Sequence, residues 1–110
     1  MATEVVFESH AEEVESEMEQ AVIRGLEAIG LTAEGYAKLA CPVDTGRLRN
    51  SISHAVDEAD GVVYIGTNVE YAPYVEYGTS KMKAQPYLKP AATEHSEEYE
   101  GIFENFLKNA

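Results

Sequence analysis

The chain has little positive charge, and this scarcity excludes two classes of partner. Its 110 residues include only 8 lysines and arginines against 20 aspartates and glutamates, a formal net charge of -12. Proteins that bind nucleic acids need a basic surface that displaces the counterions of the phosphates. Anionic membranes repel an acidic chain for the same reason. We therefore expect neither a sequence-specific nucleic-acid partner nor a membrane partner.

Cysteine and metal-binding patterns are also scarce. Cys41 is the single cysteine, so no intrachain disulfide can form, which is typical of a reducing compartment. The three histidines, His10, His54 and His95, are far apart and have no metal-ligand spacing. The first residues lack the basic start and apolar run of a signal peptide, and no apolar stretch is long enough for a membrane span. We expect a cytosolic protein with no metal and no cofactor, in which Cys41 is buried as a small apolar residue.

The rest of the composition is that of one globular domain. Hydrophobic residues make up 45% of the chain, and its length corresponds to a single domain with a modest core. The acidic excess lies at the two ends, since residues 41–92 are nearly neutral. Keeping helix surfaces soluble is the simplest role for these acids. We divide the domain into an arm or strand (1–10), a helix (11–40), a sheet with a tyrosine turn (41–89) and a C-terminal helix (90–110).

Residues 11–40 show the clearest periodicity. Apolar residues recur there at steps of three and four with glutamates opposite, which predicts a long amphipathic helix. Ser9 and Glu12 fit a capping box at its start, and Pro42 ends it. Such a helix would be ~45 Å long, more than a domain of this size requires. We expect a partner to cover part of its apolar stripe.

Three segments predict the sheet. Residues 5–7, V-V-F, form either a first strand or an arm. The apolar residues of segment 48–56 lie on one side of a period-two pattern, which predicts a strand. Residues 57–61, D-E-A-D-G, are typical of a hairpin loop, and residues 62–66, V-V-Y-I-G, of the returning strand.

Residues 68–79, N-V-E-Y-A-P-Y-V-E-Y-G-T, are rich in tyrosine. Tyr71, Tyr74 and Tyr77 stand three apart, which places them together on one helical turn or tight loop that Gly78 can close. One interpretation is core packing, with each hydroxyl bonded to a partner. The other is an aromatic anchor at a protein interface. The sequence supports both equally.

A small basic cluster follows the tyrosines. Lys81 and Lys83, with Met82 between them, could meet an acidic face of a neighbouring copy in a head-to-tail ring. Residues 85–89 read as an extended segment, and Pro90 opens a last helix. Together these elements predict an α+β fold, in which a long N-terminal helix and a C-terminal helix pack on a small antiparallel sheet.

Asp44-Thr45-Gly46 is the single match to a catalytic motif. Asp-Thr-Gly is the signature of aspartic proteases, in which two such loops share a proton between carboxylates and a dimer can complete the site. That motif follows an apolar strand, whereas here it follows the Cys-Pro end of a helix and precedes Arg47. A dimeric aspartic protease is therefore a remote alternative, and we predict that the chain is no enzyme and has no catalytic residue.

Several blocks in the middle of the chain resemble a known family. Residues 40–52, A-C-P-V-D-T-G-R-L-R-N-S-I, are similar to the A-x-P-V-D-T-G-x-L-R-x-S-I stretch of the HK97 gp10-like family of tailed-phage proteins. The blocks G-T at 66–67, Y-A-P-Y-V-E-Y-G-T at 71–79 and A-Q-P-Y-L-K-P-A at 84–91 follow in the order of that family. The resemblance covers residues from about 35 to 92.

The resemblance implies a head–tail connector or tail-completion protein of a phage or prophage. Such a protein would be made in the host bacterial cytoplasm, assemble as a homo-oligomeric ring in the virion neck or tail, and contact other head and tail proteins. The matching positions would have structural or interface roles, with Pro42 and Gly46 at a corner between helix and strand. With the residues of the tyrosine turn and of the basic cluster added, the structural and interface candidates are Pro42, Asp44, Gly46, Arg47, Tyr71, Tyr74, Glu76, Tyr77, Gly78, Lys81, Lys83, Pro86 and Pro90.

A second class of function stays open at this point, an acidic cytosolic module for regulation or interaction. Glutamates gathered into one continuous face would favour it, because such a face can bind a basic partner. Glutamates scattered around the helices would favour the phage protein.

Overall fold

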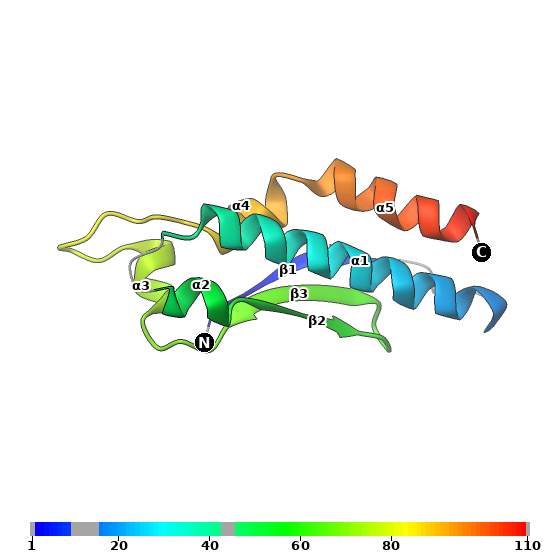
Figure 1. Ribbon diagram of the computed structural model, residues 1–110, viewed down its shortest axis with the longest axis horizontal. Coiled ribbons are helices and arrows are strands. Elements are labelled where there is room, and N and C mark those ends of the chain that lie inside the picture. The colour runs from blue at the N-terminus through cyan, green and yellow to red at the C-terminus, as the bar shows by residue number, and fades with distance from the viewer. Residues whose placement is uncertain (1, 10–15, 43–45, 110) are drawn as a thin grey trace.

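The core of the computed structural model is a three-stranded antiparallel sheet (Figure 1). Strand β3 (Val62–Thr67) lies in the centre, with β1 (Ala2–Glu8) on one side and β2 (Ser53–Asp57) on the other. A bulge between Val5 and Phe7 shifts the register of β1 against β3. The first segment is thus a strand, and the predicted loop and returning strand are confirmed. The structure describes residues 2–9, 16–42 and 46–109.

One long helix, α1 (Ser16–Ala40), crosses the sheet and contacts all three strands. Its side chains at the predicted spacing, such as Leu26, Ile29 and Ala33, are fully buried. The predicted helix is confirmed over this span and ends before Pro42. Its expected first residues and the Glu12 half of the capping box lie outside the described residues.

A short helix, α2 (Arg47–Ser51), replaces the first half of the strand predicted over residues 48–56. Leu48 and Ile52 are both buried as expected, but their spacing of four residues is one helical turn as well as an even strand step. The prediction was wrong because two apolar residues four apart fit both periods. The corner at Pro42 and Gly46 therefore joins two helices, and the strand begins only at Ser53.

The predicted C-terminal helix consists of two helices, α4 (Leu88–Thr93) and α5 (Ser96–Lys108). Helix α4 begins two residues before Pro90, so the extended segment predicted for residues 85–89 ends early. Pro90 is tolerated in the first turn, where a helix needs no N–H donor. The hydroxyl of Tyr99 donates to the carbonyl of Ala91 at 2.5 Å and thereby ties the two helices together across the break.

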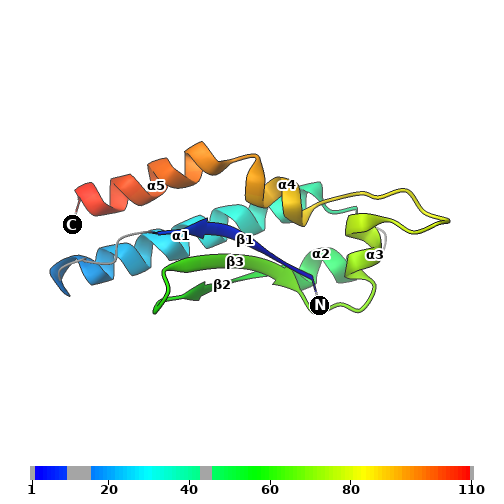
Figure 2. The same ribbon diagram turned by 180° about the vertical axis from the view of Figure 1, so that it is seen from behind.

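Helix α5 runs back along α1 in the opposite direction, and the two views of the ribbon agree on this (Figures 1 and 2). Phe103 lies beside Gly25 near one end of the pair. At the other end, the His95 ring stacks on Tyr36 with centroids 3.7 Å apart, and the Tyr36 hydroxyl donates to Glu98. The antiparallel packing brings the acidic N-terminal part of α1 and the acidic C-terminal helix to the same end of a molecule 52 Å long.

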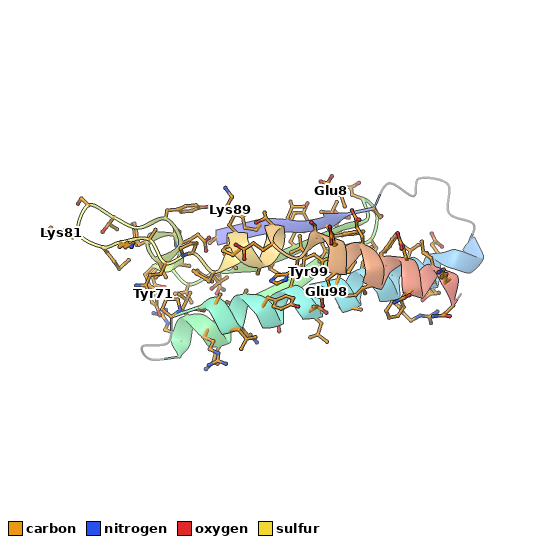
Figure 3. The ribbon with its side chains drawn as sticks, turned by 90° about the horizontal axis from the view of Figure 1, so that it is seen from above. Glu8, Tyr71, Lys81, Lys89, Glu98 and Tyr99 are labelled. Carbon is orange, nitrogen blue, oxygen red and sulfur yellow. The ribbon has the colours of Figure 1, made fainter. Side chains whose placement is uncertain are left out.

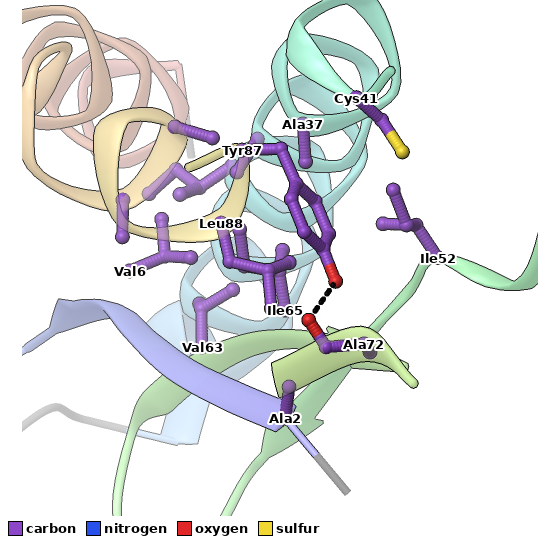
Figure 4. Close-up of a cluster of buried hydrophobic side chains, with 14 of the residues drawn as sticks. Ala2, Val6, Ala37, Cys41, Ile52, Val63, Ile65, Ala72, Tyr87 and Leu88 are labelled. Carbon is purple, nitrogen blue, oxygen red and sulfur yellow. Dashed lines mark hydrogen bonds between the residues drawn. The ribbon is translucent and has the colours of Figure 1, made fainter. Parts of the chain in front are cut away.

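Tyr87 fills the core between the sheet and α1 (Figure 4). It is fully buried near Ala37, Cys41 and Ile52, and its hydroxyl donates to the carbonyl of Ala72 at 3.3 Å. Burial raises the pKa of this hydroxyl, which therefore stays protonated. The same burial raises the pKa of the Cys41 thiol, and the expectation that Cys41 is a buried apolar residue is confirmed.

Candidate functional site

The three tyrosines of the tyrosine turn lie on or beside one short helix, α3 (Ala72–Tyr77). Pro73 occupies its first turn, as a proline can without loss of a hydrogen bond. Tyr71 is half-buried, whereas the side chains of Tyr74 and Tyr77 are exposed. Core packing thus explains Tyr71 only in part and does not explain the other two.

Residues 78–86, which we name the arm, project from α3 beyond the body of the molecule (Figure 1). Gly78 begins the arm with φ +79°, and a Cβ there would lie 2.7 Å from the backbone nitrogen of Ala84. The arm is closed at its base, where the Gln85 N–H donates to the Val75 carbonyl at 2.8 Å. Lys81 lies at its tip (Figure 3), and Lys83 is exposed nearby. The backbone therefore holds the arm in one shape.

Glu76 joins the tyrosine turn to helix α4. Its side chain is only 3% exposed, although it carries a carboxylate. One carboxylate oxygen accepts the backbone N–H groups of Tyr87 at 3.0 Å and Leu88 at 2.8 Å, and the other accepts that of Lys89 at 3.2 Å. These are N–H groups that the first turn of α4 cannot satisfy itself, and the positive end of the helix favours a negative charge there. Glu76 is thus a helix cap supplied from another helix.

Arg47 lies over Tyr71 at the other side of the turn. Its guanidinium donates two parallel hydrogen bonds to Glu70, at 3.0 and 3.1 Å, and its central carbon lies 5.5 Å from the Tyr71 ring centroid. The hydrogen bonds to Glu70 raise the pKa of Arg47, and they lower the pKa of the Glu70 carboxyl. Because both side chains are exposed, this pair orients Arg47 more than it stabilises the fold.

The structure brings some of the predicted residues together and separates others. Pro42, Gly46, Arg47 and Tyr71 line one pocket of about 570 Å³ between α2, α3 and the arm. Glu76, Gly78, Lys81, Lys83 and Pro86 belong to the base and length of the arm. Pro90 lies inside α4, and Asp44 lies outside the described residues.

Sequence reasoning missed the hydrogen bonds by which His54 of β2 joins Glu27 and Glu34 of α1, and we name these three residues the clamp. Both ring nitrogens of His54 are bonded, one to Glu27 and one to Glu34, each at 3.0 Å. Gly30 makes room for the ring, because a Cβ there would lie 2.5 Å from it. The three α1 residues share one helix face, but nothing in their spacing identifies His54 as the partner.

The clamp changes the charge of its members. Partial burial opposes the charged form of His54, but its hydrogen bonds to Glu34 and Glu27 outweigh this and raise the pKa of the imidazole. Burial likewise opposes ionisation of Glu34, yet its bonds to His54 and Lys38 hold the pKa of the carboxyl below its usual value. Ionised carboxylates only accept hydrogen bonds, so the contacts of both ring nitrogens favour the charged, doubly protonated imidazole.

Within residues 2–9, 16–42 and 46–109, no three His, Cys, Asp or Glu side chains are grouped as metal ligands would be. In this part of the chain, no helix is both long enough and apolar enough to cross a membrane. The residues around the tyrosine turn thus offer surfaces for contact, in the form of exposed aromatic rings, a pocket and a basic arm.

Comparison with known protein families gives a match. The family described as "Bacteriophage HK97-gp10, putative tail-component" matches residues 6–78. This span includes α1, α2, α3, β2 and β3 with the last three residues of β1, so it covers most of the sheet and the tyrosine turn. Comparisons with curated proteins and with solved structures give no match. The chain belongs to the HK97-gp10-like family of phage tail-component proteins.

Proposed function

We propose that the chain is a structural protein of the virion neck or tail, acting as a head–tail connector or tail-completion protein. It assembles into a ring of identical copies and docks onto neighbouring head or tail proteins. The family match over residues 6–78 carries this proposal, because the matched span covers α1, most of the sheet and the tyrosine turn. The protein is made in the host bacterial cytoplasm and then incorporated into the particle.

The surface around the tyrosine turn supports a role in assembly. Tyr74 and Tyr77 are exposed on a helix that the Glu76 cap holds in place. Rigid, exposed tyrosines are typical of binding interfaces, since they bury a large area at low entropic cost. The adjoining arm is held in one shape without packing over these rings, so it is available to a partner.

The acidic regulatory module has less support. Several glutamates of the acidic helices have partners within the chain: Glu27 and Glu34 bind His54, and Glu98 accepts the Tyr36 hydroxyl. They are divided between the two sides of α1 and do not make one free face for a basic partner. We therefore favour the virion protein.

The protease alternative also lacks support from the residues around the motif. The described elements on either side of Asp44 are the helices α1 and α2, whereas an aspartic protease places its motif after an apolar strand. We propose that the chain has a structural role and no enzymatic activity. Peptidase activity in the purified wild type, lost on substitution Asp44→Asn, would revive the protease.

The location of the protein in particles tests the proposal. Virions of the phage, or of the induced prophage, are purified, and the chain is sought by mass spectrometry and by antibody labelling in electron micrographs. We expect it in intact particles, at the neck or tail, in a fixed number of copies. Deletion of its gene should leave unjoined heads and tails or incomplete tails, which the gene supplied in trans should restore. A chain abundant in the cell but absent from particles would refute the proposal.

A further inference from the structure

A groove lies between strand β1, at the edge of the sheet, and helix α5, and we name it the edge groove. It has a volume of about 560 Å³ and is lined by residues 5–9 of the strand with Glu100 and Phe103 of the helix. The rings of Phe7 and Phe103 meet in it with centroids 5.1 Å apart. Val5 beside them is 45% exposed. The edge groove therefore offers apolar contacts to a molecule outside the chain.

The backbone of β1 is open along this groove. The N–H of Ser9 donates to the carbonyl of Gly61 at 2.8 Å, so the backbone of Ser9 faces the sheet. Backbone groups of successive residues point to opposite sides of a strand, so the N–H and C=O of Glu8 point away from the sheet. The register has no further shift beyond the bulge, so β1 is a regular strand at this point. Within the described residues, this donor and this acceptor have no partner.

The charge at the edge groove is negative. Glu8 contributes a carboxylate from β1 and Glu100 another from α5, and both side chains are exposed. Within the described residues, neither carboxylate has a hydrogen bond or an ion pair, and no lysine, arginine or histidine lines the groove. Figure 3 places Lys89 toward the other end of β1 from Glu8. A bound segment with positive charges would therefore meet two free carboxylates.

This chain has no free segment of the complementary chemistry. Only residues 47–49, R-L-R, and 81–83, K-M-K, place an apolar residue between two basic ones. Leu48 of the first run is buried in α2. Met82 of the second run lines the pocket beside Tyr71, so its side chain is directed to its own molecule. We therefore expect the occupant of the edge groove to come from a different protein.

We propose that an extended segment of a neighbouring virion protein, with alternating apolar and basic residues, binds along β1 as an added strand. Its backbone pairs with the N–H and C=O of Glu8. Its apolar side chains enter the edge groove beside Phe7 and Phe103, and its basic side chains face the two carboxylates. In this mode of recognition, backbone hydrogen bonds provide affinity and alternate side chains provide specificity. The inference rests on the proposed function, because it names the chemistry of one partner onto which the protein docks.

A synthetic peptide of sequence K-V-K-V-K-V-K is the probe, because it alternates basic and apolar residues in the extended form. NMR titration measures its affinity for the protein, and hydrogen exchange at the Glu8 amide reports the added strand. We expect saturable binding and slower exchange of this amide when the peptide is bound. The same peptide methylated at every backbone nitrogen keeps its charges and side chains but has no N–H to donate. It should bind ~10-fold more weakly or worse.

Two charge variants of the protein test where the peptide binds. The groove variant is Glu8→Lys with Glu100→Lys. The control variant is Glu58→Lys with Glu94→Lys, which has the same net charge but leaves the groove lining unchanged. All four glutamates are exposed, so the fold should persist, and circular dichroism checks this. We expect the groove variant to bind the unmethylated peptide ~10-fold more weakly than the control variant, or worse.

Three results would overturn the inference. Equal binding of the methylated peptide, or by the groove variant, would mean a general attraction between opposite charges. No binding at millimolar peptide would mean that the edge accepts no added strand. Slow exchange at Glu8 without peptide would mean that the edge is already covered, by a second copy if the effect grows with protein concentration. Each result leaves the proposed function standing, because the search for the protein in particles tests that function separately.

Discussion

The Glu76 cap should be highly sensitive to substitution, and Glu76→Gln tests this with almost no change in side-chain volume. The amide keeps one oxygen for the N–H groups of Tyr87 and Leu88 but presents an NH₂ group to Lys89. Hydrogen bonds to a charged acceptor are worth about 1.5–3 kcal/mol each, and bonds to a neutral acceptor about 1 kcal/mol. Losing one bond and weakening two should therefore cost at least about 2.5 kcal/mol of unfolding free energy. That is a large part of the roughly 5–15 kcal/mol available to a small domain.

Urea unfolding followed by circular dichroism measures this loss, and amide hydrogen exchange locates it. The Leu88 amide should exchange faster in the variant, because its acceptor has lost its charge. Glu70→Gln is the matched control, since this glutamate also accepts two hydrogen bonds but is 73% exposed, and its variant should unfold near the wild-type midpoint. The reasoning fails if Glu76→Gln changes the unfolding free energy by less than about 0.5 kcal/mol, the range of ordinary surface substitutions.

Three other predictions follow from the packing and the charges. Gly78→Ala should destabilise the protein by about 1–3 kcal/mol, because residue 78 has a positive φ. Gly101→Ala, inside α5 where a Cβ meets no neighbour, should instead stabilise the protein by up to about 1 kcal/mol. Thermal melts of the two variants measure these changes, and equal effects would contradict the prediction. His54 has a pKa raised above 6.5, so it stabilises the fold fully below pH 6.5 and loses this effect as the pH rises through the raised value. Glu34 has a pKa below 4.5, so it stabilises the fold above pH 4.5 and loses this effect on further acidification. In urea unfolding, the loss caused by His54→Gln should therefore be largest between pH 4.5 and 6.5 and shrink at higher pH, and a loss that is constant with pH would exclude the clamp. The thiol of Cys41 should react with a disulfide reagent only in denaturant, and rapid reaction of the native protein would show that it is accessible.

Local sequence patterns predicted the elements whose signals are repeated or chemically distinct. The helix α1 has apolar residues at every turn, and β3 is a strand rich in β-branched residues that follows a loop of turn residues. The tyrosine turn was predictable because Pro73 and Gly78 mark its two ends. In each case the determining residues lie within a few positions of one another.

The missed features depend on partners far along the chain. Helix α4 begins at Leu88, where Glu76, twelve positions earlier in the chain, caps its first N–H groups. The prediction that the helix begins at Pro90 was wrong because it used only the local proline signal. His54 is bonded to residues 20 and 27 positions away, a separation at which sequence spacing carries no information.

The strand order β1-β3-β2 also fixes the order in which parts of the protein can fold during its synthesis. Ala2 pairs with Thr67, and Glu8 pairs with Val62, so the first strand made must wait for one of the last parts of the sheet. Helix α1 and the hairpin of β2 and β3 involve only local contacts, and such contacts form fast. In a nascent chain that ends before Thr67, β1 therefore lacks its full partner strand and the apolar side of α1 is not yet covered by the sheet. We expect the closing of the sheet by β1 to be the slow step, and the nascent chain to be exposed to aggregation until that step is complete.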